Sequence, residues 1–354
     1  MVKAGFWKHK RVLVTGHTGF KGGWLALWLT QMGADVTGIA LAPHTEPNFF
    51  ETVGLEKRMH HIVADIRDGA ELAGLLHKAQ PEIVLHLAAQ PLVRYSYKAP
   101  VETYETNVMG TVNLLEAVRA CPGVKATLII TTDKCYENVE QIWGYREHDR
   151  LGGHDPYSNS KACAELVVQA YTRSFFVPGG KSGAIASARA GNVIGGGDWS
   201  EDRLVPDLVR GLMQGQAPVL RNPSSVRPWQ HVLEPLSGYL MLAEMMYGKI
   251  QDDPVAYNFG PDTSGQVDVG TLARRFCEVW GGGIEPQIVP DPKAVHEAHL
   301  LTLDITKARK QLHWNPVWDM EQTVVETASW YKAYTQNEDM LRFSLDQIER
   351  YCAA

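Results

Sequence analysis

The sequence predicts an α/β protein with a doubly wound parallel sheet and a smaller mixed α/β lobe toward the C-terminus. Short β-branched runs alternate with longer stretches of helical periodicity over roughly the first 190 residues, the pattern of a parallel sheet covered by helices. The alternation breaks at the glycine run 195–197, which several prolines follow. We therefore expect a first domain over 1–190 and a substrate lobe over 191–354, from which the chain can cross back to the first domain.

Each expected strand is a short run of β-branched and other apolar residues. The expected strands lie at 11–15, 35–41, 61–64, 82–87, 126–132 and 183–190. The segments between them have apolar residues at helical spacing and are long enough for crossover helices. The expected helices lie at 20–32, 68–79, 99–120 and 157–176.

Composition limits the partners of the chain. Its 354 residues are 45% apolar and 21% charged, which suits a large folded core. With 34 basic and 40 acidic residues the net charge is -6, so no basic surface for nucleic acid is expected. The five cysteines contain no C-x-x-C pair, which argues against a zinc site or a disulfide framework. We expect a cytoplasmic protein with reduced thiols, without a metal, a signal peptide or a membrane span.

A glycine-rich turn follows the first strand and precedes an apolar helix. Residues 16–22 read G-H-T-G-F-K-G. Glycines at this spacing let the backbone turn tightly and approach a pyrophosphate at the N-terminus of the helix. The turn therefore predicts dinucleotide binding, although an ordinary glycine-rich turn can have the same spacing. The expected cofactor contacts in it are Gly16, Thr18, Gly19, Phe20 and Gly22.

The second strand bears on the choice of dinucleotide. Folds of this kind often end that strand with an acidic residue that binds the adenosine ribose, but residues 38–43 read G-I-A-L-A-P. No arginine stands there to hold a 2′-phosphate, so we expect NAD in preference to NADP. Asp65 and Ile66, after the third strand, are candidates for contact with the adenine edge, and an exposed N-cap aspartate is the alternative.

Tyr157 and Lys161 stand four residues apart and therefore on one face of the expected helix. A nearby ammonium group favours the phenolate form of tyrosine and makes it a usable base near neutral pH. Such a pair is often only part of a solvated helix face. Its place downstream of the glycine-rich turn and of T-T-D-K at 131–134 favours a catalytic pair that also contacts the cofactor.

Longer motifs connect these residues to a known family. Residues 15–22 match T-G-x-x-G-F-x-G, and Tyr157 with Lys161 matches Y-x-x-x-K. On these motifs the chain resembles the extended short-chain dehydrogenase/reductase family, which implies a Rossmann-type sheet. The family's cofactor-lining segments are matched by H-L-A-A-Q at 86–90 and N-V-M-G-T at 107–111. They imply cofactor contacts at Leu87, Ala88, Ala89 and Asn107.

Within that family the chain is most similar to the nucleotide-sugar 4,6-dehydratases. The segments that carry this similarity are 86–94, 131–136, 189–199 and 227–232. The resemblance implies that Thr132 binds the sugar 4-hydroxyl, that Tyr157 takes its proton, and that a hydride passes from C4 to NAD and later returns to C6. Water leaves across C5 and C6, and Asp133 is placed to be the acid if it stays protonated. An N-cap or ion-paired loop aspartate is the alternative.

Lys134 departs from the commoner dehydratase pattern, in which a glutamate follows the aspartate as the C5 base. The lysine matches the subgroup that acts on cytidine-diphosphate sugars, so CDP-glucose is the implied substrate. Lys134 either removes the C5 proton or stabilises the enolate by its charge. The implied product is a precursor of deoxysugars in surface polysaccharide such as the O-antigen of lipopolysaccharide.

The resemblance also implies residues that grip the nucleotide and its diphosphate. Arginine suits this role because its planar guanidinium donates two hydrogen bonds to phosphate oxygens, and a solvated surface arginine is the alternative. The implied substrate contacts are Gln90, Arg189, Asn192, Arg203, Leu204, Val205 and above all Arg227.

The helix 157–176 is apolar on more than one face after Lys161, which leaves Glu165 and Gln169 to meet water. A helix that is apolar nearly all round is buried on both sides. We expect one face on the sheet and the other, together with the helix 99–120, in a homodimer. Coverage by the C-terminal lobe is the alternative.

Two further function classes stay open at the level of sequence. Another nucleotide-sugar enzyme, such as a dTDP- or GDP-hexose dehydratase or a UDP-hexose 4-epimerase, also uses Tyr157 and Lys161. A 4-epimerase does not need the pair at Asp133 and Lys134. A non-catalytic dinucleotide-binding regulator needs none of these four side chains.

Overall fold

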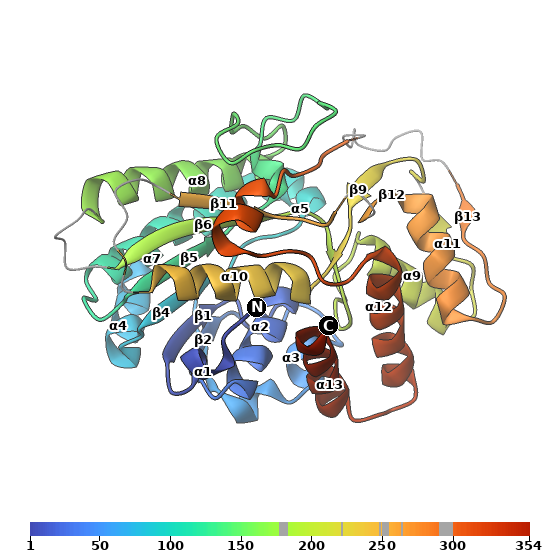
Figure 1. Cartoon of the computed structure of the whole chain (residues 1–354), viewed down its shortest axis with the longest axis horizontal. Helices are drawn as coiled ribbons and strands as arrows, with labels where there is room; N and C mark the ends of the chain where they lie inside the picture. Colours follow the sequence, from blue (N-terminus) through green and yellow to red (C-terminus); the bar gives the residue numbers. More distant parts are fainter. Residues whose placement is uncertain (177–182, 221, 248, 250–254, 263–264, 290–299) are drawn as a thin grey trace.

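The computed structural model describes the chain except for residues 177–182, 221, 248, 250–254, 263–264 and 290–299. Within the described residues, the centre of the molecule is a sheet of seven strands in the order β11-β6-β5-β4-β1-β2-β3 (Figure 1). Neighbouring strands of this sheet pair in parallel, and the chain winds outward in both directions from β1 and β4. The predicted doubly wound α/β fold is confirmed.

Six of these strands lie where the sequence predicts them, with ends that differ by at most two residues. They are β1 (Arg11–Thr15), β2 (Asp35–Ala40), β3 (His60–Val63), β4 (Ile83–His86), β5 (Ala126–Ile130) and β6 (Ala184–Ala190). The edge strand β11 (Val255–Phe259) is the one that sequence analysis missed. It pairs with β6 and brings the second half of the chain back into the sheet.

Three of the expected helices form as predicted: α2 (Phe20–Gln31), α4 (Gly69–Ala79) and α8 (Pro156–Phe175). The fourth is divided, because α6 (Pro100–Tyr104) and α7 (Gly110–Arg119) are joined by a π-helical turn, η2 (Glu105–Met109). Widened turns of this kind are frequent at functional sites, and this one carries the buried side chain of Asn107. A Cβ on Gly110 would lie 2.5 Å from Cδ1 of Ile66, so a glycine is needed where the turn ends.

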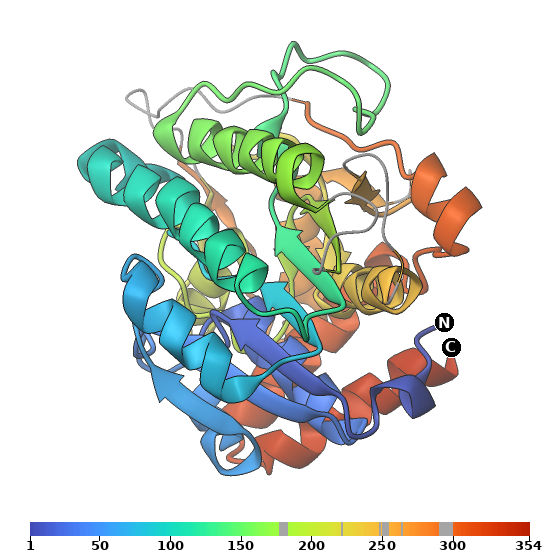
Figure 2. The ribbon, with the colours of Figure 1, turned by 90° about the vertical axis from the view of Figure 1, so that its left-hand side faces the viewer.

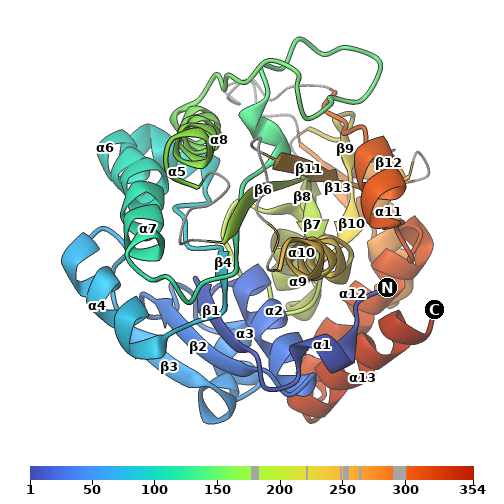
Figure 3. The same ribbon diagram turned by 60° about the vertical axis from the view of Figure 1, so that its left-hand side comes forward.

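Helices cover both faces of the sheet (Figures 2 and 3). One face packs against α4, α7 and α8 and buries Leu13, Val84 and Ile129. The other face packs against α2 and α10 (Leu233–Met246) and buries Val14. Because successive side chains of a strand point to opposite faces, neighbouring residues such as Leu13 and Val14 serve separate layers of the core.

The C-terminal half adds short strand pairs and helices beside the sheet, on the right of Figure 1. The strand pairs are β7 (Val193–Ile194) with β10 (Gln230–His231), β9 (Val226–Pro228) with β12 (Gln266–Asp268), and β8 (Val219–Leu220) with β13 (Gln287–Ile288). The helices are α9 (Leu204–Met213), α11 (Val269–Trp280), α12 (Met320–Thr335) and α13 (Met340–Ala353). The last helix returns to α2, where the rings of Tyr351 and Trp28 lie 5.7 Å apart.

Short segments connect these elements. They are α1 (Ala4–Trp7), α3 (Phe49–Thr52), η1 (Leu55–Arg58), α5 (Val93–Lys98), η3 (Asp133–Cys135) and η5 (Ala308–Leu312). In the described part of the chain, no helix has the length and apolar character needed to cross a membrane. The described residues also contain no group of His, Cys, Asp and Glu side chains that could hold a metal ion.

Candidate active site

The site lies at the carboxyl ends of β1 and β4, where the two halves of the sheet diverge. Ligands of doubly wound sheets bind at such a switch point. Thr15 and His86 are paired at the ends of these strands, and a hydrogen bond of 2.7 Å joins the Thr15 hydroxyl to Nδ1 of His86. This contact sets the glycine-rich turn after β1 beside residues 87–90 after β4.

The glycine-rich turn has the geometry of a phosphate cradle. Gly16 has a φ of 77°, and a Cβ there would lie 2.7 Å from the backbone nitrogen of Ala88. A Cβ on Gly22 would lie 2.1 Å from the Gly16 carbonyl oxygen. Gly19 begins α2 without a side-chain cap, and a Cβ there would meet only Gly16, at 3.4 Å. The uncapped helix end and the open side of the turn fit a dinucleotide pyrophosphate.

The other predicted cofactor residues surround this cradle. Thr18 donates a hydrogen bond of 2.9 Å to the Leu41 carbonyl and fixes the turn to the end of β2. Half-buried residues on both sides of the turn are Phe20, Leu87, Ala88 and Ala89.

Asn107 ties the loop after β4 to the helix α8. Its side-chain amide donates to the Gln90 carbonyl at 3.1 Å and to the Ser160 hydroxyl at 2.8 Å.

Asp65 accepts three hydrogen bonds from Arg67, which lower the pKa of its carboxyl. The predicted contact of Asp65 and buried Ile66 with adenine stays a prediction.

Tyr157 and Lys161 rise from the first turns of α8. Asp155 caps this helix by accepting from the Ser158 amide at 2.9 Å. Nζ of Lys161 donates at 3.2 Å to the carbonyl of Ile130, the last residue of β5. Burial lowers the pKa of Lys161 to about 8, so its ammonium form is less favoured than in water.

The phenol of Tyr157 forms a hydrogen bond with Thr132. Burial raises the pKa of Tyr157 to about 12, while the charge of Arg203 and the bond to Thr132 act in the opposite direction. The structure thus brings Thr132, Tyr157 and Lys161 together, as the sequence predicts. Their arrangement can orient a substrate hydroxyl and remove its proton.

Asp133 lies beside Thr132 at the start of η3 and is almost fully buried. Its Oδ1 accepts from the Thr132 hydroxyl at 2.9 Å, whereas its Oδ2 has no hydrogen-bond partner among the described residues. Burial raises the pKa of Asp133, against the opposing charges of Lys134 and Arg227. A buried carboxyl with a raised pKa and an oxygen that no described residue binds is suited to act as an acid.

Sequence analysis missed Lys21, the second residue of α2. Burial, with the charges of Arg203 and Lys161, lowers the pKa of Lys21 to about 8, and Asp133 acts against this shift. The ammonium group of Lys21 therefore lies in the same site as the predicted catalytic side chains. The available signal was a single charged residue in the first turn of an otherwise apolar helix.

Two predicted substrate arginines lie at the same site. Arg203 pairs with Asp198 at 2.9 Å and acts on the pKa of Tyr157. Arg227, on β9, donates to the Val226 carbonyl at 2.9 Å, and its charge acts on Asp133. These cations make the surroundings of Tyr157 and Asp133 positive, which suits an anionic substrate.

The remaining predicted substrate residues are partly or fully buried, or take part in hydrogen bonds within the chain. Leu204 is half-buried and Val205 is buried at the start of α9. The Asn192 carbonyl accepts from the Gln230 amide at 3.1 Å. The side-chain amide of Gln90 donates to the Thr103 hydroxyl at 2.9 Å. Contacts of these four residues with substrate stay predictions.

Arg189 does not fit its predicted role. Its side chain is 1% exposed, and Nη2 donates to Glu165 at 2.7 Å. Nη1 donates to the Tyr136 hydroxyl at 2.7 Å and to the Glu147 carbonyl at 2.9 Å. A guanidinium that is enclosed and paired in this way cannot reach a substrate phosphate, so the prediction for Arg189 is wrong. The expectation that Glu165 meets water is wrong for the same reason.

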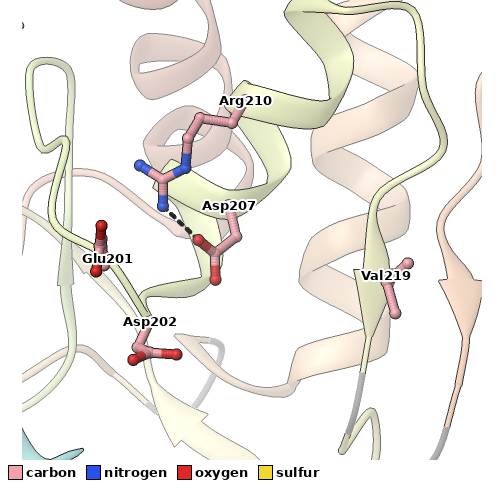
Figure 4. Close-up of a pocket in the computed structure, with 5 residues that line it drawn as sticks. All are labelled: Glu201, Asp202, Asp207, Arg210 and Val219. Atoms are coloured by element: carbon pink, nitrogen blue, oxygen red, sulfur yellow. Dashed lines mark hydrogen bonds and ion pairs between the residues drawn. The ribbon is translucent and has the colours of Figure 1, made fainter.

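A surface pocket of about 420 Å³ lies next to Arg203 in the sequence but has the wrong charge for the substrate (Figure 4). Its lining consists of Glu201, Asp202, Asp207, Arg210 and Val219. Asp207 forms an ion pair with Arg210, and Asp202 forms one with Arg94 at 3.0 Å. Glu201 adds a further carboxylate, which makes the pocket negative. Such a pocket repels a diphosphate.

Comparison with known proteins agrees with this geometry. A family model described as GDP-mannose 4,6 dehydratase matches residues 13–327. The chain is 49% identical to the CDP-glucose 4,6-dehydratase of Salmonella typhimurium, over 100% of this chain and 99% of that protein. It is 28% identical to a dTDP-glucose 4,6-dehydratase of Xanthomonas campestris pv. campestris, over 90% of this chain and 92% of that one.

Solved structures share the fold. The UDP-glucose 4-epimerase of Thermotoga maritima with UDP-glucose has a TM-score of 0.78 at 24% identity, over 92% of this chain and 99% of that one. The dTDP-glucose 4,6-dehydratase of Bacillus anthracis in complex with NAD has a TM-score of 0.76 at 22% identity, over 94% of this chain and 99% of that one. The family match covers most of the sequence, and the chain belongs to the GDP-mannose 4,6 dehydratase family.

Proposed function

We propose that the chain is an NAD-dependent CDP-glucose 4,6-dehydratase, a lyase that converts CDP-D-glucose to CDP-4-keto-6-deoxy-D-glucose. The observation that carries the proposal is the grouping of Thr132, Tyr157 and Lys161 with a buried Asp133 beside a phosphate cradle. The choice of CDP-glucose rests on the 49% identity to the Salmonella typhimurium enzyme over the whole chain.

The glycine-rich turn fits NAD. Gly16, Gly19 and Gly22 would hold the pyrophosphate at the N-terminus of α2, and Lys161 with Tyr157 would face the nicotinamide end. When bound, NAD supplies an acceptor for the hydride of sugar C4 and a donor that returns it to C6.

The chain's own residues handle the protons of the oxidation at C4. Thr132 binds the 4-hydroxyl and Tyr157 takes its proton, and the loss of the C4 hydride together with this proton leaves a ketone at C4. Lys161 favours the phenolate form of Tyr157 by its charge. The cations Lys21, Arg203 and Arg227 hold the negative substrate in the site.

The ketone makes the C5 proton acidic, and loss of water follows. Lys134 removes this proton or stabilises the enolate that forms. Asp133 gives its proton from Oδ2 to the 6-hydroxyl, which leaves as water. The C5 proton and the 6-hydroxyl leave as the elements of water. When the hydride returns to C6, C5 takes up a proton again, which balances the proton that Tyr157 took from the 4-hydroxyl, and the sugar keeps the ketone at C4.

Turnover of labelled nucleotide sugars tests this proposal. CDP-glucose deuterated at C4 is expected to give a 4-keto product deuterated at C6, whereas dTDP-, GDP- and UDP-glucose give little or none. A C4 epimer without loss of water would instead indicate an epimerase. Cofactor binding without turnover of any of the four sugars would indicate a regulator.

The chain also forms a homodimer through α6, η2 and α8. Apolar side chains on these elements are exposed, among them Val101 at 69%, Met109 at 51% and Leu166 at 54%. Helices α9 to α13 lie away from this surface (Figure 3). An arginine in place of Leu166 should give monomers in sedimentation analysis, while the same change at exposed Ile288, far along the chain, should not. Monomeric wild-type protein would contradict the dimer.

A cytoplasmic location is part of the same proposal. All five cysteines are free, as in proteins of reducing compartments.

A further inference from the structure

A fully buried carboxylate lies one helical turn beyond the catalytic lysine. Glu165 is 1% exposed and follows Lys161 by four residues, so both lie on one face of α8. Its Oε1 accepts from the Thr131 hydroxyl at 2.5 Å. Its Oε2 accepts from the Ser187 hydroxyl at 2.7 Å and from Nη2 of Arg189 at 2.7 Å. Burial opposes ionisation of Glu165, but Arg189 and these hydroxyl donors together lower its pKa.

The partner of this carboxylate is fixed from the other side. The Arg189 guanidinium lies 4.9 Å from the ring centre of Tyr136 and donates to the Tyr136 hydroxyl and to the Glu147 carbonyl. The Tyr136 hydroxyl in turn donates to Asn258 on β11 at 2.8 Å. The ion pair is therefore held by β5, β6, α8 and β11 at once, and neither charge can turn toward solvent.

Glu165 interacts with two parts of the proposed catalytic machinery, by a hydrogen bond with one and by its charge with the other. Thr131, which it binds, directly precedes Thr132 and Asp133 in the chain. Lys161 donates to the carbonyl of Ile130, the residue before Thr131. Glu165 thus links the segment after β5, which carries Asp133, to the part of α8 that carries Lys161.

Four groups face the Lys161 ammonium from the surrounding elements. The negative charge of Glu165 on α8 favours the ammonium form, and a thiolate of Cys135 on η3 would do the same. The positive charge of Lys21 on α2 opposes it, and a protonated His86 on β4 would do so too. Burial raises the pKa of Cys135 well above its ordinary value and lowers that of His86 to about 3, so both are neutral near pH 7. The full negative charge that supports the ammonium is that of Glu165.

We propose that Glu165 is a positioning residue for the reaction: its carboxylate, held by Arg189, keeps Lys161 protonated and locks the Thr131–Asp133 segment against α8. The link to turnover rests on the proposed function. The protonation of Lys161 does not, because it can be measured without substrate.

Both variants of the ion pair should remove the negative charge that supports the Lys161 ammonium. In Glu165→Gln the carboxylate itself is lost, so the pKa of Lys161 should fall. In Arg189→Gln the buried carboxyl loses the charge that holds its pKa low and takes up a proton, so the pKa of Lys161 should fall as well. A purely structural ion pair predicts similar losses of stability in both variants and no shift in the pKa of Lys161.

Nuclear magnetic resonance of chain labelled with ¹³Cε-lysine measures this directly, with Lys161→Arg assigning the signal. We expect the titration midpoint of Lys161 to move down by about one pH unit in Glu165→Gln and to move down in Arg189→Gln as well. The alkaline limb of the kcat profile should move in the same direction, because activity is lost as Lys161 deprotonates. A midpoint that stays unchanged or rises in Glu165→Gln would overturn the proposal.

A double variant keeps the test decisive if either single variant fails to fold. Glu165→Gln with Arg189→Gln leaves no unpaired buried charge. Since Glu165 lies on the helix turn next to Lys161, the midpoint should still fall below that of the wild type, and an unchanged midpoint would refute the proposal. A wild-type chain that shows the lysine titration but turns over no nucleotide sugar would refute the proposed function alone.

Discussion

Replacement of Asp133 by asparagine should separate the two halves of the proposed reaction. Asparagine has the size of aspartate, and its Oδ1 can still accept from the Thr132 hydroxyl, a bond of 2.9 Å in the structure. It has no acidic proton to give to the sugar 6-hydroxyl. Because Tyr157 and Lys161 are unchanged, we expect oxidation at C4 to continue while loss of water slows.

The size of the effect follows from the surroundings of the lost oxygen. Asp133 Oδ2 has no hydrogen-bond partner among the described residues, so the substitution breaks none of their contacts. The cost therefore falls on the acid step. A positioned general acid contributes about 10²- to 10⁴-fold in rate, which corresponds to about 3 to 5 kcal/mol of barrier.

Rapid-quench single turnovers with mass spectrometry of the nucleotide sugars measure both steps. Asp133→Asn should accumulate CDP-4-keto-glucose before the 4-keto-6-deoxy product. Asp198→Asn is the matched control, because Asp198 is also buried but pairs with Arg203 at 2.9 Å. It should raise KM without accumulation of the intermediate. Equal slowing of both steps in Asp133→Asn, or normal loss of water, would show that Asp133 is not the acid.

Tyr157→Phe removes only the phenol oxygen and should abolish C4 oxidation with an unchanged circular dichroism spectrum; normal turnover would exclude Tyr157 from the mechanism. Lys134→Met should spare oxidation but suppress exchange of the C5 proton with deuterated water, and normal exchange would exclude Lys134 from that step. Burial raises the pKa of Glu234 to about 7, so the folded chain holds a proton that the unfolded chain releases above about pH 4.5. The free energy of unfolding should therefore fall by about 3 kcal/mol between about pH 4.5 and 7. Denaturant titrations should show no such fall in Glu234→Gln, and an equal slope in both proteins would contradict this origin.

Most of the central sheet could be predicted from sequence because its strands are buried. β4 and β5 are buried along their whole length and are apolar except for His86 and Thr127, and this signal does not depend on distant parts of the chain. β11 gives a weaker signal, because its first two residues are only half-buried and it contains Asn258. That asparagine is stabilised by the Tyr136 hydroxyl and by the carbonyl of Tyr145. Such partners are more than a hundred residues away and cannot be inferred from local pattern.

In the candidate site, too, the residues that depend on local spacing could be predicted and those that depend on distant packing could not. Tyr157 and Lys161 share a local spacing on one helix, and the structure places them together. Arg189 was assigned to the substrate by the family resemblance, and Glu165 was assigned to the surface by its charge. Arg189 is on β6 and Glu165 on α8, so whether the two charges meet depends on how the helix packs on the sheet. This packing makes one buried ion pair of an expected substrate contact and an expected surface charge.

The positive charge of Lys134 suits its place beside the buried carboxyl of Asp133. Burial raises the pKa of the Asp133 carboxyl, and general acid catalysis is best when the pKa of the acid lies close to the working pH. A glutamate at position 134 would raise that pKa further by repulsion. Lys134 and Arg227 act in the opposite direction, although burial still prevails and keeps the pKa raised. The charge of Lys134 therefore serves the acid step as well as the C5 step, and Lys134→Met should slow loss of water even if another group removes the C5 proton.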